Sequence, residues 1–213
     1  MPFIGRQPTS VPLTSSDITD GIISTAKIAD DAVTGAKIEN NPTISGNLTV
    51  SGLSNITLET DLWRLNTNLS MTSGVNAITA NWERHDSYSH GVPLGTGMSE
   101  SSGIFTFGQT GVYFIQLQGS FLVGGSNSLY TGMHIITTTD NSTYIGASVS
   151  YTNNNSGGTS SYYAVTTQHI FDVTDTSTHK VKISYENQVT NGTVLGHTNV
   201  NQTTVIFTRL GNT

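Results

Sequence analysis

The sequence predicts an all-β sandwich or jelly roll over its C-terminal part, preceded by an extended segment that needs a partner chain. Three observations lead to this prediction. Short stretches of alternating polar and apolar residues recur toward the C-terminus, with turn residues between them. The composition, rich in serine, threonine and asparagine and with 22 glycines, favours strands and turns over helices. A repeat near the N-terminus has no apolar partner face in its own segment.

Residues 1–16 are the first element, and they contain Pro2, Pro8 and Pro12. Proline fixes φ and lacks a backbone donor, so this segment is predicted to be an extended arm and not a helix. Its spaced apolar residues suit docking onto another protein, and a disordered tail is the alternative. The candidate docking residues are Phe3, Ile4, Val11 and Leu13.

Residues 17–60 contain the repeat and a glycine-punctuated strand. Gly21–Ile28 (GIISTAKI) is followed ten positions later by Asp31–Ile38 (DAVTGAKI), and a strand pattern then runs over Thr43–Leu53. Two repeats are too few for a solenoid, so we expect several chains to wrap together into an intertwined collar and stalk. The residues expected to meet between chains are Ile22, Ile28, Val33, Ile38, Leu48 and Val50.

The remainder, residues 61–213, is predicted to be a globular knob of many short strands. The expected strands are Gly103–Gly108, Val112–Val123, Tyr130–Thr138, Thr143–Tyr151, Ser161–Val173, His179–Glu186 and Thr203–Leu210. Alternation places one set of side chains inward, namely Tyr113, Ile115, Leu117, Phe121, Val181, Ile183 and Tyr185. It places another set outward, namely Gln116, Gln118, Ser120, Lys180, Lys182, Ser184 and Glu186.

Both tryptophans stand near the start of this knob, in Asp61–Leu65 (DLWRL) and Asn81–His85 (NWERH). A tryptophan buries a large area, so Trp63 and Trp82 are expected in the core or between subunits. An arginine follows each of them. We consider that these arginines pair with the acidic neighbours Asp61 and Glu83 across subunits.

Charge and cysteine content exclude several classes of protein. Only 10% of residues are charged, and the net charge of −6 includes no basic cluster, so we expect no nucleic-acid partner. No apolar run is long enough for a membrane span, and we expect no membrane insertion. Without cysteine there is no disulfide and no thiolate site. The N-terminus lacks a charged and then apolar leader, so we expect synthesis without export.

The chain shows no pattern of catalytic residues. Its carboxylates are sparse, and it has neither a G-x-S-x-G elbow nor a phosphate-binding loop, so we expect no enzyme and no cofactor. No loop has the oxygen spacing of a calcium site, and the six histidines are scattered, so no metal site is predicted. In a trimer, a histidine or aspartate on the axis would be present three times, which keeps an axial metal site open as an alternative.

One loop has groups that suit sugar recognition. Asn153–Gly158 (NNNSGG) supplies amides, and Tyr151, Tyr162 and Tyr163 lie near it in the sequence. The alternative is that asparagine and glycine are there because they make good turns. The candidate receptor-facing residues are Asn153, Asn154, Asn155 and Tyr162.

The knob resembles a known family of jelly rolls. Phe105–Ile115 (FTFGQTGVYFI) resembles the strand pair at the heart of the complement-globular-head and tumour-necrosis-factor-like jelly rolls. Thr203–Gly211 (TTVIFTRLG) resembles the final strand of that family, which is central in its sheet, and Trp82–Met98 resembles its opening segment. The resemblance covers about residues 80–211 and implies an antiparallel jelly roll.

The first part of the chain resembles the stalks of fibre proteins from tailed bacteriophages. The similarity lies in Ser15–Ile23, Ala26–Ile38 and Gly46–Gly52, and the opening Phe3-Ile-Gly-Arg with Pro8 resembles their virion-docking termini. Proteins of both families are homotrimers. The resemblance therefore implies a homotrimeric fibre or spike, assembled in the host cytoplasm. Its partners would be other virion proteins of the tail or capsid, and its knob would meet a host surface, with a glycan as candidate ligand.

Two other functions remain open at this point. The chain is alternatively a capsid decoration protein, or head fibre, that stabilises the shell or gives weak adhesion. A free lectin or signalling ligand of the complement-head type is a third class, which the absence of a leader disfavours.

Overall fold

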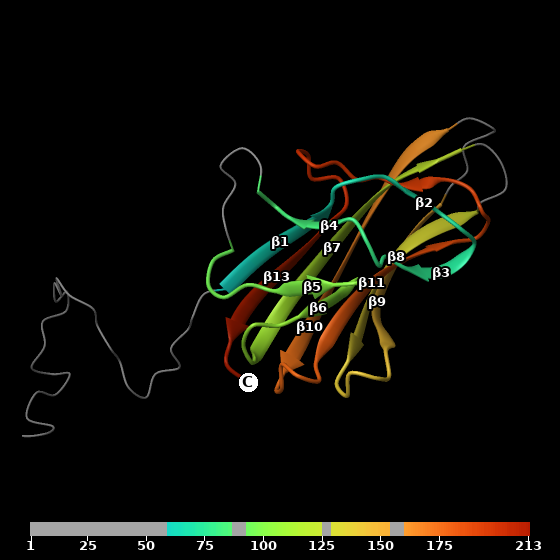
Figure 1. Cartoon of the computed structure of the whole chain (residues 1–213). Coiled ribbons are helices and arrows are strands. Elements are labelled where there is room, and N and C mark those ends of the chain that lie inside the picture. Colours follow the sequence, from blue (N-terminus) through green and yellow to red (C-terminus); the bar gives the residue numbers. More distant parts are fainter. Residues whose placement is uncertain (1–58, 87–92, 125–128, 154–159) are drawn as a thin grey trace, which may run out of the picture. The chain divides into compact units, whose positions relative to one another are not determined.

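The computed structural model describes residues 59–86, 93–124, 129–153 and 160–213 (Figure 1). This part of the chain contains thirteen β-strands and no helix, and every ladder between them is antiparallel. The all-β class predicted from composition and alternation is therefore confirmed.

Seven strands form the first sheet, which we call sheet A. Their order is β2-β12-β7-β13-β1-β4, and β10 also pairs with β7. The strands are β1 (Glu59–Leu65), β2 (Leu69–Ser70), β4 (Trp82–Arg84), β7 (Gly111–Val123), β10 (Ser161–Val173), β12 (Thr193–Val194) and β13 (Thr204–Gly211). The final strand, β13, lies between β7 and β1, which confirms the central position predicted for it.

Six strands form the second sheet, sheet B. Their order is β5-β6-β11-β8-β9, and β3 also pairs with β11. The strands are β3 (Gly74–Ala77), β5 (Ser99–Ser101), β6 (Ile104–Thr106), β8 (Tyr130–Thr138), β9 (Ile145–Asn153) and β11 (Lys180–Asn187). Most neighbours in both sheets are far apart in sequence, as in a jelly roll.

The expected strand pair at Phe105–Ile115 is wrong in one respect. The strand of Phe105 is β6 in sheet B, where it pairs with β11, whereas the strand of Tyr113 is β7 in sheet A. The chain crosses between sheets at this turn, so the aromatic side chains meet in the core instead of lying along one face. The rings of Phe107 and Tyr113 are 4.5 Å apart.

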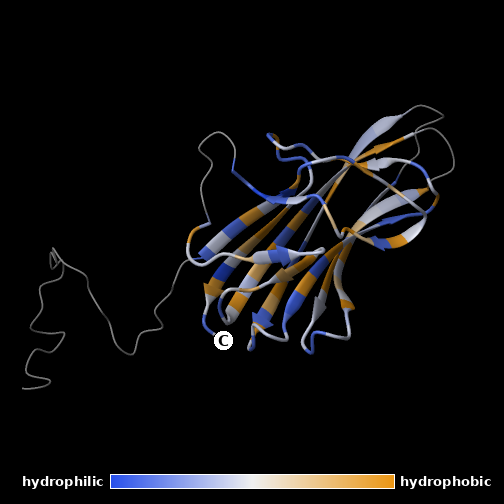
Figure 2. Ribbon diagram, in the orientation of Figure 1, coloured by the Kyte–Doolittle hydropathy of each residue, from blue (hydrophilic) through white to orange (hydrophobic). Residues whose placement is uncertain are grey.

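The core lies between the two sheets. Figure 2 shows hydrophobic and hydrophilic residues alternating along the long strands, as expected when one face of each sheet is buried. All seven side chains predicted to point inward on β7 and β11 are buried. Two residues predicted to point outward, Lys180 and Ser184, are buried as well. The Lys180 ammonium donates a hydrogen bond to the Thr176 carbonyl (2.7 Å), which gives this buried polar group a partner at the start of β11.

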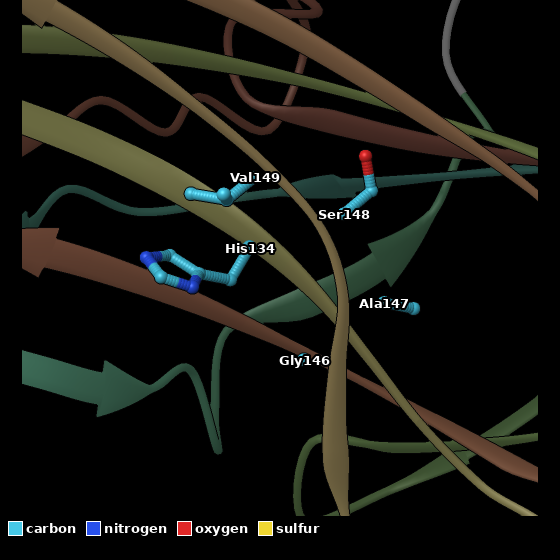
Figure 3. Close-up of a pocket in the computed structure, with 5 residues that line it drawn as sticks. All are labelled: His134, Gly146, Ala147, Ser148 and Val149. Carbon is cyan, nitrogen blue, oxygen red and sulfur yellow. The ribbon is translucent and has the colours of Figure 1, made fainter.

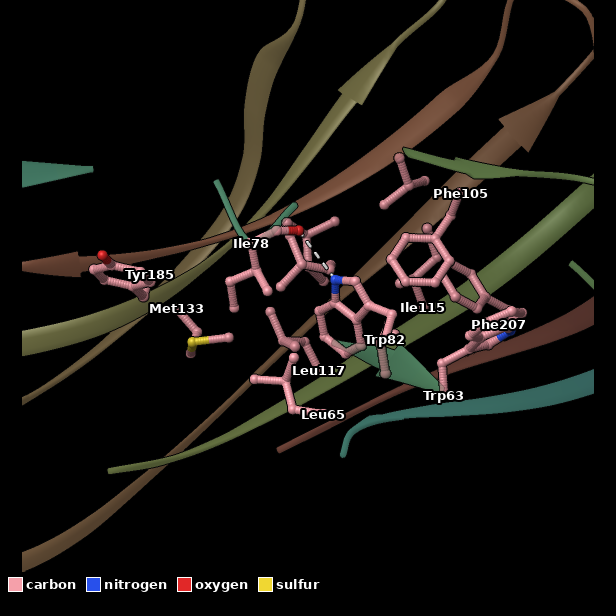
Figure 4. Packing of buried hydrophobic residues seen from close by; sticks show 14 of the residues in the cluster. Trp63, Leu65, Ile78, Trp82, Phe105, Ile115, Leu117, Met133, Tyr185 and Phe207 are labelled. Atoms are coloured by element: carbon pink, nitrogen blue, oxygen red, sulfur yellow. Dashed lines mark hydrogen bonds between the residues drawn. The ribbon is translucent and has the colours of Figure 1, made fainter. Parts of the chain in front are cut away.

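Both tryptophans belong to this core (Figure 4). Trp63 and Trp82 pack edge-to-face on Phe105, with ring centroids 5.7 and 5.3 Å apart. The indole N–H of Trp82 donates to the carbonyl of Ile78 at 3.0 Å, so its polar atom is satisfied. The tryptophans were predicted to lie in the core or between subunits, and the structure places both in the core.

The arginines that follow the tryptophans pair within one chain, which corrects the idea of pairing across subunits. Arg84 binds both carboxylate oxygens of Asp61, and Arg64 binds Glu83 with its Nε at 3.0 Å from Oε1. The cause is register: β4 lies beside β1, so Trp63 is opposite Arg84 and Arg64 is opposite Glu83.

Candidate functional site

A row of three residues crosses the outward face of sheet B. Glu186 on β11 is opposite Gly132 on β8, and Gly132 is opposite Tyr151 on β9. The Tyr151 hydroxyl donates a hydrogen bond of 2.6 Å to Glu186 Oε2. The tyrosine side chain therefore crosses the middle strand and joins its two neighbours.

Gly132 makes this crossing possible. A Cβ at this position would lie 2.4 Å from Cδ1 of Tyr151 and 2.7 Å from Cε1. The ring thus occupies the space above the glycine backbone, which is how aromatic side chains cover glycines in β-sheets. Tyr151 nevertheless remains 49% exposed, so one face of a firmly held ring is open to solvent.

Tyr130 and His134 stand on either side of the crossing, two residues before and two after Gly132 on β8. Both rings are nearly perpendicular to that of Tyr151, at 86° and 87°, with centroids 5.3 and 5.8 Å away. Both side chains also reach the carboxylate: the Tyr130 hydroxyl donates to Glu186 Oε1 at 3.1 Å, and His134 Nε2 lies 2.9 Å from Oε2. We call these four side chains, with Gly132, the Tyr151 platform.

The hydrogen bonds of the platform lower the pKa of its carboxyl group and raise the pKa values of its two phenols. The bond from Tyr151, with those from Tyr130 and His134, holds the pKa of Glu186 below its ordinary value, against the opposite effect of burial. The bond of Tyr151 to Glu186 raises the pKa of Tyr151 to about 12, and the separate bond of Tyr130 to Glu186 raises the pKa of Tyr130. At neutral pH the platform therefore combines a carboxylate with two neutral phenols.

A small hollow adjoins the platform at His134, which belongs to both (Figure 3). It has a volume of about 130 Å³ and is lined by His134 and by Gly146, Ala147, Ser148 and Val149. The ladder between β8 and β9 shifts register here, between Ile135 and Ile136. Such an irregularity re-aims side chains and leaves one strand residue without a partner.

The structure places two of the predicted receptor-facing residues on different sheets. Asn153 is exposed at the end of β9, opposite Tyr130, so it borders the platform. Tyr162 is 76% exposed on β10 of sheet A. Asn154 and Asn155 lie outside the described residues.

The predicted arm and stalk also lie outside the described residues. This holds for the docking residues Phe3, Ile4, Val11 and Leu13 and for the stalk residues Ile22, Ile28, Val33, Ile38, Leu48 and Val50. Their roles stay predictions.

Sequence reasoning missed the platform as a unit. The sequence does hold a signal, because Tyr130, Gly132 and His134 alternate on one strand and Glu186 is outward on another. What it lacks is the register that brings Tyr151 across to a residue 35 positions away.

The described ranges contain neither a candidate metal centre nor a candidate membrane-spanning helix. No three histidine, aspartate or glutamate side chains in them gather closely enough to hold a metal ion. No helix in the same ranges is long and apolar enough to cross a membrane.

Comparison with known proteins supports the fold. Neither a protein-family model nor a curated protein sequence matches the chain. The structure is similar to crystal structures of murine APRIL at pH 8.5 and pH 8.0, each with a TM-score of 0.51 and 12% identity. The match covers 72% of this chain and 99% of the APRIL chain.

A second similar structure is that of Eiger TNF from S. frugiperda. Here the TM-score is 0.52 and the identity 10%, over 74% of this chain and 95% of the other. At such low identity the similarity concerns the fold alone, and it agrees with the tumour-necrosis-factor-like jelly roll predicted from Phe105–Ile115 and Thr203–Gly211.

Proposed function

We propose that this chain is a homotrimeric fibre or spike protein of a tailed-bacteriophage virion. Residues 1–16 anchor it to the particle, the residues from 17 to the start of β1 intertwine, and the jelly-roll knob, which begins with β1 at Glu59, attaches to the host surface. The stalk-like motifs Ala26–Ile38 and Gly46–Gly52 and the tumour-necrosis-factor-like fold of the knob together support this function.

The composition of the outward face of sheet A is the main structural support for a trimer. On β7, β10 and β13 the outward side chains are amides, hydroxyls and apolar groups, and Asp172 is the one charged residue among them. Phe114, Ile170 and Ile206 lie on this face, and Ile170 is 61% exposed. Identical copies can meet on such a face without like-charge repulsion, and would bury its exposed apolar groups.

Sedimentation of the full chain tests the trimer. We expect a mass three times the 22.6 kDa of one chain, and a monomer at micromolar concentration would overturn the proposal.

Replacing Ile28 and Ile38 together by aspartate is expected to loosen the stalk or block assembly while the knob stays folded. Normal assembly of that double variant would overturn the intertwined collar.

Experiments on purified phage particles test the proposed role in the virion. Antibody labelling of the knob on purified particles should place the chain on the tail or on the capsid, and unlabelled particles would overturn the proposal. Deleting residues 1–16 should leave a folded trimer that no longer joins particles. Particles without the chain should adsorb poorly to host cells; unchanged adsorption would instead favour the decoration role.

A further inference from the structure

We propose that the Tyr151 platform is a subsite for the pyranose ring of an uncharged saccharide, with the ring stacked on Tyr151 and its hydroxyls bonded to Glu186. The inference rests on the proposed function in that it names the class of host-surface ligand. It moves the expected contact from the loop tip at 153–158 to the strand face of sheet B.

The first argument is the fixed, open ring of Tyr151. The Gly132 backbone supports one ring face, the hydroxyl is tied to Glu186, and two perpendicular rings flank the edges. A side chain held in this way loses little conformational freedom when a ligand binds. One face of a pyranose is lined by C–H groups, which pack well on the electron-rich face of an aromatic ring.

The second argument is the polar group at the edge of that ring. A carboxylate has about four acceptor positions, and Glu186 uses three of them for the platform's own donors. One remains for a ligand hydroxyl, and the phenol oxygen of Tyr151 can accept another. An aromatic plane with acceptors along its rim matches a molecule with an apolar face and a rim of hydroxyl donors.

The third argument is the hollow beside His134. Its volume of about 130 Å³ leaves room for a substituent of a ring stacked next to it. The lining residues Ala147 and Val149 are apolar, and the hydroxyl of Ser148, which also lines the hollow, is hydrogen-bonded to the Thr167 hydroxyl at 2.6 Å. The hollow would thus help to select among saccharides by their substituents.

Charge selects against acidic saccharides. Glu186 is an anion at neutral pH and would repel a uronate placed on Tyr151. The nearest cation along the same strand, Lys182, has its ammonium 3.5 Å from the centre of the Tyr144 ring and is engaged there.

Saturation-transfer NMR on the full-length protein tests the subsite. The probes are methyl glycosides of glucose, galactose, mannose and N-acetylglucosamine, with galacturonate as the anionic comparison. We expect transfer to the ring C–H protons of at least one neutral probe and none to galacturonate. The ring resonance of Tyr151, assigned by its loss in Tyr151→Phe, should shift with the same probe. The absence of both signals for every neutral probe overturns the proposal.

Saccharide binding by variants distinguishes a ligand-binding role of Tyr151 from a purely structural one. Tyr151→Ala should weaken binding by about tenfold or more, and Tyr151→Phe, which keeps the ring, should weaken it less. Ile145→Ala is the control, since Ile145 is 66% exposed on β9 but belongs to neither the platform nor the hollow; it should bind as the parent does. Equal binding by Tyr151→Ala and the parent overturns the proposal, and the wild-type resonance shift decides the matter if Tyr151→Ala fails to fold.

Binding of the labelled protein to host cells distinguishes this proposal from the proposed function. If the wild-type protein binds cells and Tyr151→Ala binds equally well, the subsite is wrong and the attachment role stands. If the wild-type protein binds a neutral probe but no host cells, the attachment role is wrong and the subsite stands.

Discussion

The hydroxyl of Tyr113, on the central strand β7, donates a hydrogen bond of 2.8 Å to Oε2 of Glu59, the first residue of β1. Both side chains are almost completely buried. The other carboxylate oxygen of Glu59 accepts from the Gly97 N–H at 2.8 Å. Burial and the bond to Glu59 raise the pKa of Tyr113 well above its ordinary value. This carboxylate therefore ties the start of the knob to its central strand.

Removing the Tyr113 hydroxyl should destabilise the knob. In Tyr113→Phe the buried Glu59 loses one donor, and hydrogen bonds to charged groups contribute about 1.5–3 kcal/mol. We expect the free energy of unfolding to fall by about 2 kcal/mol in urea titrations at a fixed chain concentration. Tyr144→Phe removes a hydroxyl whose hydrogen bond to Asn141 is an exposed contact of 3.5 Å, and it should have little effect. Equal stabilities of the two variants would contradict the structural role of the Glu59 bond.

Asp61 should be the more important of two paired aspartates. It is 3% exposed and accepts from the Trp63 indole at 2.9 Å, the Met98 N–H at 2.8 Å and Arg84. Asp61→Asn keeps the shape but lacks the charge and leaves Arg84 unpaired, so we expect a loss of about 3 kcal/mol. Asp86→Asn is the control, because the Asp86 side chain is 73% exposed in its pair with Arg64. Arg64 keeps its bonds to Glu83 when Asp86 is neutralised, so we expect a loss of about 1 kcal/mol or less. A larger loss in Asp86→Asn than in Asp61→Asn would reverse this ranking.

A negative charge on the outward face of sheet A should break the trimer. Ile170→Glu would place three carboxylates on the faces proposed to meet, and we expect monomers in sedimentation at micromolar concentration. Ile145→Glu is matched in residue type and exposure, at 66% against 61%, but it lies on β9 of sheet B. This control should remain trimeric; dissociation by Ile145→Glu alone would move the interface to sheet B.

An alanine at position 132 should displace the Tyr151 ring. The new Cβ would overlap Cδ1 of that ring, and overpacking costs about 1–3 kcal/mol. We expect lower stability in Gly132→Ala, and a loss of the Tyr151–Glu186 bond visible in the tyrosine NMR spectrum. Gly146→Ala, on the neighbouring strand β9, meets nothing within 4 Å and should leave that spectrum unchanged. An unchanged spectrum in Gly132→Ala would mean that the ring does not lie over the glycine.

Glu186 should give the knob a pH-dependent stability. Its pKa is lowered in the folded chain from an unfolded value of about 4.3. The stabilisation is therefore present above that value and is lost as the pH falls through the lower folded-state pKa. We expect Glu186→Gln to be less stable at pH 7 and to lose less stability than the parent as the pH falls below about 5. Parallel acid-denaturation curves for the two proteins would contradict this.

The alkaline side offers an independent measurement on the same variant. In the parent, Glu186 raises the pKa of Tyr151 to about 12, whereas a free tyrosine titrates at about 10. The neutral glutamine removes the charge, so tyrosinate absorbance should develop at lower pH in Glu186→Gln. A titration identical to that of the parent would show that the hydroxyl is not bound to Glu186.

The sequence alone identified the long strands and, for β7 and β11, the side chains that face the core. Predicted and observed limits agree closely for β7, β8, β10 and β11, because a half-buried strand imposes an alternation that is visible over eight or more residues. The short strands β2, β3 and β12 have two to four residues and were not predicted. A segment of that length cannot show a period, and only its neighbours make it a strand.

Only the tertiary structure decided which strands are neighbours and in what register. It placed β6 and β7 in opposite sheets where a strand pair was expected, and it brought Tyr151 across Gly132 to Glu186. The period of two determines which face a residue joins, but a shift of register by two residues keeps every face and changes every partner. The sequence therefore determined that Glu186 points outward, and long-range packing determined that it meets Tyr130 and His134 around one tyrosine ring.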